Sequence, residues 1–79
     1  MVTVRYFAAA ADAAGTISDS YEPATLGELI AAMRERHGHA LGEVVGRCSL
    51  LLDGARVSDP ATELVAGAKL DVLPPFAGG

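Results

Sequence analysis

The 79-residue sequence is poor in basic residues, in cysteine and in large aromatic side chains. It has six basic residues, only one of them lysine, against ten acidic ones, and it contains no tryptophan. A protein that neutralises nucleic-acid phosphates needs clustered lysine and arginine, so this balance argues against a nucleic-acid partner. The single cysteine, Cys48, permits no internal disulfide and makes no metal site.

Long apolar segments and targeting signals are also missing from the sequence. No apolar run approaches the roughly 18 residues that span a bilayer. Residues 6–11 are apolar, but no basic segment precedes them and Asp12 follows them, which is unlike a signal peptide. We therefore expect a cytoplasmic protein without a membrane partner.

The supply of core-forming residues indicates one small globular domain. Leu, Ile, Val and Phe make up about a quarter of the chain, above the roughly one-fifth below which chains tend to be disordered. A chain of this length buries only about 60% of its unfolded surface, so its stability is expected to be marginal. We expect one domain over residues 1–73, followed by an extended tail over residues 74–79.

Alternation of apolar and polar residues predicts a strand at each end of the domain, over residues 1–7 and 69–73. One set of apolar side chains shares a face of these strands: Val2, Val4, Tyr6, Leu70 and Val72. Phe7 and Leu73 fall on the opposite face. A register shifted by one residue would instead bury Phe7 and Leu73 in the core.

The best-defined element between these strands is a helix. Thr25 and Glu28 form a capping box, in which each side chain satisfies a free backbone donor of the first turn. Apolar residues follow at helical spacing from Leu26 to Met33. Gly38 ends the helix, because glycine accepts the backbone conformation that is common just after a helix.

Two further strand segments are predicted between the termini. Residues 16–22 fit a strand with Ile17 and Tyr21 as its anchors. The Asp53-Gly54 pair suits the tight turn of a hairpin over residues 48–57. The three consecutive leucines in this hairpin cannot all point to one face of a sheet.

Two short segments are expected to contain single helical turns. Residues 8–15 are nearly all alanine and are expected to form a loop with one such turn. Leu41, Val44 and Val45 fit another. The predicted order is therefore β-β-α-β-β with a final strand, which is typical of a two-layer α+β domain. A single helix covers only one face of the sheet, so we expect the other face to meet another protein.

The last seven residues, Leu-Pro-Pro-Phe-Ala-Gly-Gly, have a composition that suits insertion into a partner. Pro74 and Pro75 favour a stiff, extended segment, and Phe76 offers a large apolar anchor. The three residues after it have almost no side chain and can enter a narrow channel. An extended chain over residues 74–79 reaches roughly 20 Å.

We expect the α-carboxylate of Gly79 to be the reactive group. Its reference pKa of about 3.3–3.7 makes it an anion at neutral pH, able to attack an activated phosphate without a base. Adenylation by ATP would give a mixed anhydride, from which a sulfur nucleophile would displace AMP to leave a thiocarboxylate. We expect this chain to bind no cofactor, so a partner enzyme must supply ATP, Mg²⁺ and the sulfur.

Other chemically versatile residues have a structural interpretation. Cys48 has no designated base nearby and is expected to be a buried small hydrophobe rather than a nucleophile. His37 and His39 lack a further ligand, so we expect no metal site and assign them to a solvated or dipole-stabilised helix end.

Several of these features resemble a known family. The strand over residues 2–7, the capped helix from Leu26, the turn from Leu64 to Gly67 and the Pro-Pro-Phe-Ala-Gly-Gly ending are similar to the small subunit of molybdopterin synthase. More broadly, they resemble the ubiquitin-like sulfur carriers, which include the thiamine-pathway carrier. The resemblance covers the whole chain. It implies a β-grasp fold with a mixed sheet of four to five strands, whose first and last strands are parallel neighbours, and one main helix on one face.

The resemblance also implies a function for the chain as a carrier rather than an enzyme. An E1-like adenylyltransferase would activate Gly79, and the tail would then enter the large subunit of molybdopterin synthase to deliver sulfur to the pterin precursor. Gly79 is then the reactive end and Gly78 its threading neighbour. The candidate partner-binding residues are Phe7, Leu73, Pro74, Pro75, Phe76 and Ala77.

Two alternative functions use the same end group. The chain would be a sulfur carrier for thiamine, cysteine or another sulfur metabolite, or a ubiquitin-like protein modifier or interaction module. Two departures from the family pattern bear on the choice of partner. Residues 8–14 carry only one charged residue, Asp12, and Ala68 stands where an acidic residue is common in the family.

Overall fold

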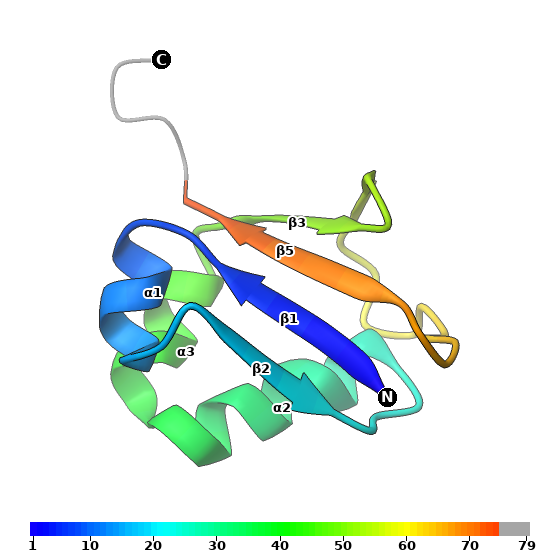
Figure 1. Ribbon diagram of the computed structural model, residues 1–79, viewed down its shortest axis with the longest axis horizontal. Helices are drawn as coiled ribbons and strands as arrows, with labels where there is room; N and C mark the ends of the chain where they lie inside the picture. The colour runs from blue at the N-terminus through cyan, green and yellow to red at the C-terminus, as the bar shows by residue number, and fades with distance from the viewer. Residues whose placement is uncertain (75–79) are drawn as a thin grey trace.

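The computed structural model describes residues 1–74, which form five strands and three helices (Figure 1). In chain order these are β1 (Val2–Tyr6), α1 (Ala9–Ala14), β2 (Ser18–Tyr21), α2 (Leu26–His37), α3 (His39–Val45), β3 (Ser49–Leu52), β4 (Ala55–Val57) and β5 (Lys69–Leu73). The strands make one sheet in the order β2-β1-β5-β3-β4. The observed class is α+β, as the sequence predicted.

The first and last strands are parallel neighbours in the middle of the sheet. Val4 lies opposite Leu70 and Arg5 lies opposite Asp71, while the other strand pairs are antiparallel. Parallel strands need a long crossover connection, and the segment between β1 and β5 that contains the helices supplies it. This mixed sheet confirms the arrangement that the family resemblance implied.

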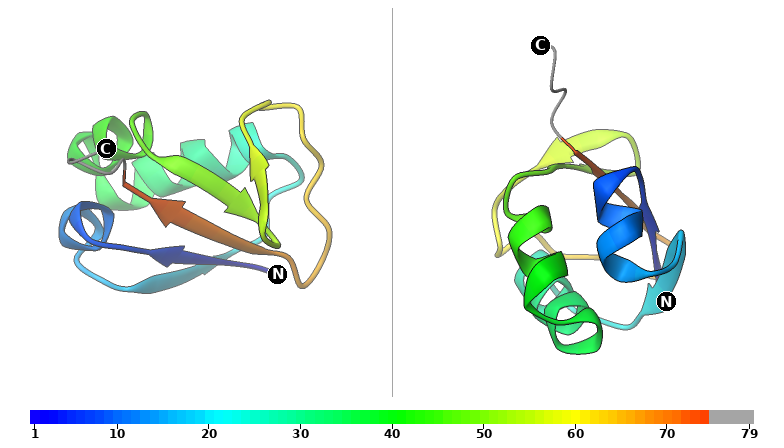
Figure 2. Two further views of the ribbon diagram at one scale, coloured as in Figure 1. Left: turned by 90° about the horizontal axis from the view of Figure 1, so that it is seen from above. Right: turned by 90° about the vertical axis from the view of Figure 1, so that its left-hand side faces the viewer.

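The core lies between the sheet and the helices, on one face of the sheet only. Figure 2 shows α2 and α3 on the same side of the sheet, with α1 against α3 near the end of β1. The inward side chains of the strands are fully or nearly fully buried: Val2, Val4, Tyr6, Tyr21, Leu50, Leu70 and Val72. Leu26, Leu29 and Met33 of α2 pack against this layer and are at most 1% exposed. The period-two and helical patterns therefore identified the two halves of the core correctly.

Helix α2 begins and ends where the capping residues predict. The Glu28 amide donates to Thr25 Oγ1 at 3.3 Å, and the Ala24 amide donates to Glu28 Oε1 at 2.9 Å. At the other end Gly38 has φ 91°, and its amide donates to the Arg34 carbonyl. A positive φ of this size favours glycine, so the helix ends there for a local reason.

Three expectations about the connecting segments were wrong in detail. The alanine-rich segment expected to be a loop with one helical turn forms the six-residue helix α1, in which Ala10 is completely buried. Residues 39–45 form a seven-residue helix, α3, rather than one turn. Ile17 does not anchor a strand, because β2 begins after it and its side chain is 77% exposed.

Within residues 1–74, no helix combines the length and the apolar character that crossing a membrane requires.

Candidate functional site

The face of the sheet opposite the helices carries the residues predicted to meet a partner. Phe7 follows β1, its amide donates to the Val72 carbonyl at 3.2 Å, and its side chain is 38% exposed. Its ring lies 5.8 Å from the guanidinium carbon of Arg5, which points outward from β1. Leu73 is half-buried on the outer side of β5. Both residues thus point away from the core, and the alternative register that would bury them is not observed.

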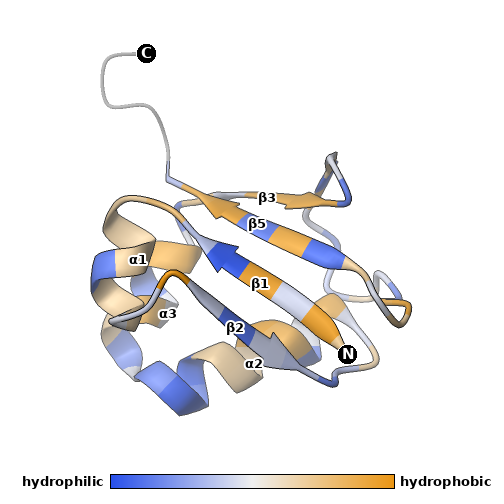
Figure 3. Ribbon diagram, viewed as in Figure 1, coloured by the Kyte–Doolittle hydropathy of each residue, from blue (hydrophilic) through white to orange (hydrophobic). Residues whose placement is uncertain are grey.

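The register of the sheet defines this outer face, which alternates residue by residue with the core face. Figure 3 shows the matching alternation of hydropathy along β1 and β5. Its side chains come from all five strands and from Phe7: Thr3, Arg5, Phe7, Ser18, Ser20, Ser49, Leu51, Arg56, Lys69, Asp71 and Leu73. Leu51 takes the outward position between the inward-facing Leu50 and Leu52. The face is therefore partly apolar and partly charged, whereas the core face is apolar except for Asp19 and the hydroxyls of Tyr6 and Tyr21.

An ion pair stands at the centre of the outer face. Arg5 Nε donates to Asp71 Oδ1 at 2.7 Å, and Arg5 Nη2 donates to Asp71 Oδ2 at 3.0 Å. The hydrogen bonds and the charge of Asp71 raise the pKa of Arg5 above its ordinary value. Arg5 uses two of its five N–H donors in this pair. The two hydrogens of Nη1 and the second hydrogen of Nη2 do not contact Asp71.

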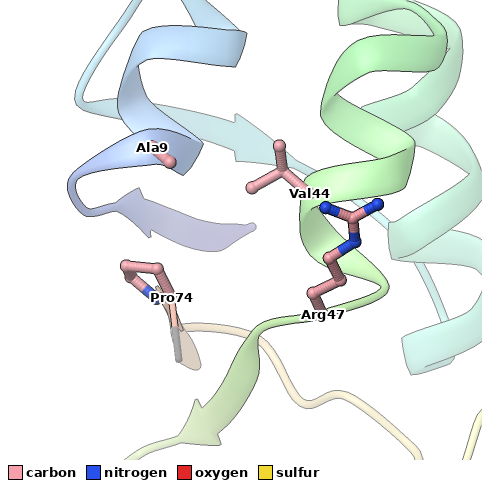
Figure 4. Close-up of a pocket in the computed structure, with 4 residues that line it drawn as sticks. All are labelled: Ala9, Val44, Arg47 and Pro74. Atoms are coloured by element: carbon pink, nitrogen blue, oxygen red, sulfur yellow. The ribbon is translucent and has the colours of Figure 1, made fainter. Parts of the chain in front are cut away.

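Strand β5 ends beside a small pocket at the point where the predicted tail begins. The pocket has a volume of about 240 Å³ and is lined by Ala9, Val44, Arg47 and Pro74 (Figure 4). Figure 4 shows that these residues come from α1, from α3 and the turn after it, and from the end of β5. Pro74 is half-buried. The pocket therefore offers apolar walls and one guanidinium group beside the start of the tail.

The remaining predicted tail residues lie outside the described part of the chain. They are Pro75, Phe76, Ala77, Gly78 and Gly79. Their assigned roles stay predictions.

A polar cluster at the edge strand β2 was not predicted from the sequence. Asp19 of β2 points to the core side, where its Oδ2 accepts hydrogen bonds from the hydroxyls of Tyr6 at 2.9 Å and Tyr21 at 3.2 Å. His37 Nε2 also bonds this oxygen, and Arg36 Nη1 lies 3.5 Å from Oδ1. Because a carboxylate only accepts, His37 Nε2 must carry a hydrogen. The cluster ties the edge strand β2 to the end of α2.

The cluster shifts the acid–base properties of its members. Burial disfavours the charged form of Asp19, but the hydrogen bonds from His37, Tyr6 and Tyr21 outweigh it and lower the pKa of Asp19. Burial, together with the neighbouring hydroxyl and carboxylate, raises the pKa of Tyr6. The one sequence signal for the cluster is that buried tyrosine hydroxyls need a hydrogen-bond partner, and an aspartate two residues before Tyr21 can be that partner. His37 is thus half-buried, not the solvated residue that was expected.

Cys48 and His39 show no catalytic arrangement in the described part of the chain. Cys48 is half-buried just before β3, and burial raises the pKa of its thiol. A thiol that resists ionisation is a poor nucleophile, which agrees with its predicted structural role. His39 is exposed, and its Nε2 lies 3.1 Å from Oε1 of Glu43, one turn further along α3.

The sheet order, the parallel central pair and the helix across one face define a ubiquitin-like β-grasp protein. Comparison with protein families gives the particular family. The model of the ThiS family matches residues 4–79, and the chain belongs to that family. This confirms the predicted membership of the ubiquitin-like sulfur carriers. A search of curated protein sequences found no match.

Solved structures with this fold include small archaeal modifier protein 1 (SAMP1) and a subunit of molybdopterin-converting factor. SAMP1 from Haloferax volcanii is 27% identical with a TM-score of 0.78, and the match covers 99% of this chain and 98% of that one. A chain in the complex of subunits 1 and 2 of molybdopterin-converting factor from Helicobacter pylori is 28% identical with a TM-score of 0.76, covering 99% and 97%. The BexX/CysO complex from Amycolatopsis orientalis matches at 23% identity and a TM-score of 0.82, with 100% of both chains covered, and shows the shared fold alone.

Proposed function

We propose that this chain is a sulfur carrier whose C-terminal Gly79 is adenylated, converted to a thiocarboxylate and used to donate sulfur in molybdopterin biosynthesis. The observation that carries the proposal is the ThiS family match, which runs through the Pro-Pro-Phe-Ala-Gly-Gly ending to Gly79. The 28% identity to a chain of the H. pylori molybdopterin-converting factor complex favours this pathway.

The proposed chemistry takes place in two displacements at the end of the chain. The Gly79 carboxylate attacks the α-phosphorus of ATP and pyrophosphate leaves, which gives an acyl-adenylate. Hydrosulfide from the sulfur donor then attacks the acyl carbon, AMP leaves with the electron pair of the broken C–O bond, and loss of the sulfur-bound proton leaves the thiocarboxylate. An E1-like adenylyltransferase would bind ATP and Mg²⁺ and bring them to the end of this chain. We place these steps in the cytoplasm.

The folded domain would serve to position the tail. Pro74 follows β5, and β5 is hydrogen-bonded on both sides, to β1 and to β3. A central strand is the most constrained part of a small sheet, so the origin of the tail has a fixed place relative to the outer face. Phe7, Leu73 and Pro74 would then contact the partner surface, while Pro75, Phe76 and Ala77 lead Gly78 and Gly79 into its active site.

Two partners would use this arrangement in turn. The first is the E1-like adenylyltransferase, and the second is the large subunit of molybdopterin synthase, in which the thiocarboxylate gives up its sulfur. The chain would thus contribute the reactive end of a synthase complex without being the catalyst itself. A large subunit of another sulfur-accepting synthase, for thiamine, cysteine or a different sulfur metabolite, is the alternative recipient.

A second candidate function is protein modification, which the 27% identity to SAMP1 favours. A modifier shares the adenylation step but ends in an isopeptide bond between Gly79 and a target lysine. The two functions therefore share the activation step and differ in the nucleophile that then attacks the acyl carbon of Gly79. It is sulfur in a carrier and a lysine amine in a modifier.

Intact-mass spectrometry tests the proposal. The purified chain is incubated with the E1-like enzyme, MgATP and a sulfur donor. We expect a mass gain equal to the replacement of one oxygen by sulfur. A chain that lacks Gly79 and a chain with one extra residue after Gly79 should show no gain while retaining the circular-dichroism spectrum of the wild type. Absence of the gain in the wild type, or its persistence in the shortened chain, would refute the carrier function.

The recipient is then identified by sulfur transfer. The thiocarboxylated chain is mixed with the large subunit of molybdopterin synthase and the pterin precursor, and separately with thiazole-synthase-like and cysteine-synthase-like enzymes and their substrates. Loss of the extra mass only with the molybdopterin enzyme supports the proposed pathway. Loss only with another enzyme, or conjugates to lysine in place of sulfur transfer, overturns it.

A further inference from the structure

Basic residues are concentrated on the outer face of the sheet. Arg5, Arg56 and Lys69 all project from it, which is half of the six basic residues in the sequence. Asp71 is the single acidic side chain among its outward strand positions. The other nine acidic residues lie on the helices, in the loops and turns, or on the core side of β2: Asp12, Asp19, Glu22, Glu28, Glu35, Glu43, Asp53, Asp59 and Glu63. The outer face is therefore cationic, although the chain as a whole has a net charge of −4.

The positive charge of this face is not cancelled within the described residues. Asp71 is fully engaged with Arg5, and neither Arg56 nor Lys69 takes part in an ion pair within residues 1–74. Arg56 Nη2 lies 3.4 Å from Ser49 Oγ, which keeps its side chain along the face. The carboxylate of Asp53, in the turn between β3 and β4, accepts a hydrogen bond from the backbone amide of Lys69 at 3.0 Å.

The basic residues form a continuous pattern with the apolar ones. Arg5, Asp71, Leu51 and Arg56 lie opposite one another in a single row across four strands. Lys69 continues the pattern toward one end of β5, and Leu73 lies at the other end, next to the tail. The face thus combines a small apolar area near the start of the tail with cations farther from it.

We propose that this outer face docks onto an acidic protein surface, which presents carboxylates to Arg5, Arg56 and Lys69 and an apolar patch to Phe7 and Leu73. The choice of partner, the E1-like adenylyltransferase, rests on the proposed function. Charge complementarity of this kind steers encounter and fixes orientation more than it adds affinity. Here it would orient the sheet so that the tail starts at the mouth of the active site.

A protein surface fits these observations better than a nucleic acid does. The rest of the chain carries nine acidic residues against three basic ones and would repel a polyanion. The apolar residues Phe7, Leu51 and Leu73 on the same face have no counterpart in a phosphate backbone. A partner with both carboxylates and an apolar patch matches the basic residues and the apolar residues of the face.

Association kinetics with matched charge reversals test the proposal. The purified full-length chain and the purified E1-like enzyme of the same organism are mixed at several salt concentrations. Arg56→Glu and Lys69→Glu change exposed residues of the outer face, and Arg34→Glu makes the same change in net charge on α2. We expect each outer-face variant to lower the association rate constant about tenfold at low salt, with Arg34→Glu near the wild type. Thermal unfolding of each variant shows that its fold is retained.

The outcomes separate docking from function. If both outer-face variants match Arg34→Glu, or if the wild-type rate does not depend on salt, the docking proposal is wrong even when the mass gain at Gly79 is normal. If the variants associate more slowly but the wild type gains no sulfur, the docking proposal holds and the carrier function fails. Salt-sensitive binding of a double-stranded RNA oligonucleotide at concentrations where the enzyme does not bind would overturn the assignment of a protein partner.

Discussion

Arg5 and Asp71 lie 66 positions apart in the chain and form a two-point hydrogen-bonded ion pair across the central parallel strands. Arg5 belongs to β1 and Asp71 to β5, the strand that ends next to Pro74. The pair therefore joins the beginning of the fold to the origin of the proposed reactive tail. Among the residues of the five strands it also engages the single outward carboxylate, that of Asp71, and leaves Arg56 and Lys69 as unpaired cations of this face.

The first prediction concerns the stability that this ion pair provides. Asp71→Asn should lower the urea midpoint of unfolding only slightly, because the Arg5 side chain is 52% exposed and water screens the pair. Leu70→Ala, at the neighbouring and completely buried position, should cost about 2–5 kcal/mol. Urea titrations followed by circular dichroism measure both. An equal loss for the two variants would contradict the surface character of the pair.

The second prediction concerns Phe7 as a contact with the partner. Phe7→Asp should weaken binding to the E1-like enzyme and to the large subunit by about tenfold or more, as loss of an apolar anchor does. Val65→Asp is the matched control, because Val65 is also apolar and is 68% exposed but lies outside the sheet. Isothermal titration calorimetry measures both affinities. Equal weakening by the two variants would mean that Phe7 has no special place at the interface.

The elements that the sequence predicts well are those specified by local signals. Helix α2 is bounded by a capping box at Thr25 and by Gly38, both of which act within a few residues. The first and last strands, β1 and β5, have clear alternation, which assigned Phe7 and Leu73 to the outer face correctly. Their parallel pairing came from the family resemblance, since alternation alone does not specify the neighbour of a strand.

The features that the sequence did not reveal depend on contacts between distant segments. Helix α1 consists almost entirely of alanine, so no apolar stripe marks its extent in the sequence, and the contacts of its small side chains with the core appear only in the fold. The cluster around Asp19 requires the end of α2 to lie over β2. The cationic outer face is hidden by an acidic composition until the strand register places Arg5, Arg56 and Lys69 together.

The third prediction is a loss of stability in acid that depends on Asp19. The pKa of Asp19 is lowered in the folded chain, so the unfolded chain takes up its proton first, near the ordinary value of about 3.9. The contribution of Asp19 to stability is therefore complete above that pH and declines as the pH falls through the lower folded pKa. Unfolding free energies from urea titrations between about pH 2.5 and 7 should show this decline.

Two variants identify the group that is responsible for the decline in acid. Asp19→Asn should lower stability at neutral pH and flatten the acid limb of the profile, because the titrating carboxylate is gone. Asp12→Asn removes a carboxylate from the exposed side of α1 and should leave the acid limb in place. A profile for Asp19→Asn as steep as that of the wild type would show that other carboxylates determine acid stability.

The fourth prediction uses the contrast between Cys48 and the proposed thiocarboxylate on Gly79. A thiol reacts with alkylating agents as the thiolate, and burial raises the pKa of Cys48, so little thiolate forms at neutral pH. A thiocarboxylate is ionised at that pH. Brief treatment of the sulfur-loaded chain with iodoacetamide should therefore label the C-terminal peptide, with Cys48 at least about tenfold slower.

Peptide mass spectrometry locates the label, and two controls define the comparison between Cys48 and the tail. In urea, where Cys48 loses its burial, labelling of Cys48 should accelerate, while labelling of the tail should change little. Cys48→Ala should leave the labelling of the tail intact, because the thiol plays no part in the transfer. If Cys48 in the native chain is labelled as fast as in urea, its thiol is accessible and ionised. The structural role of Cys48 would then be wrong, and a direct part for its sulfur in the transfer would have to be considered.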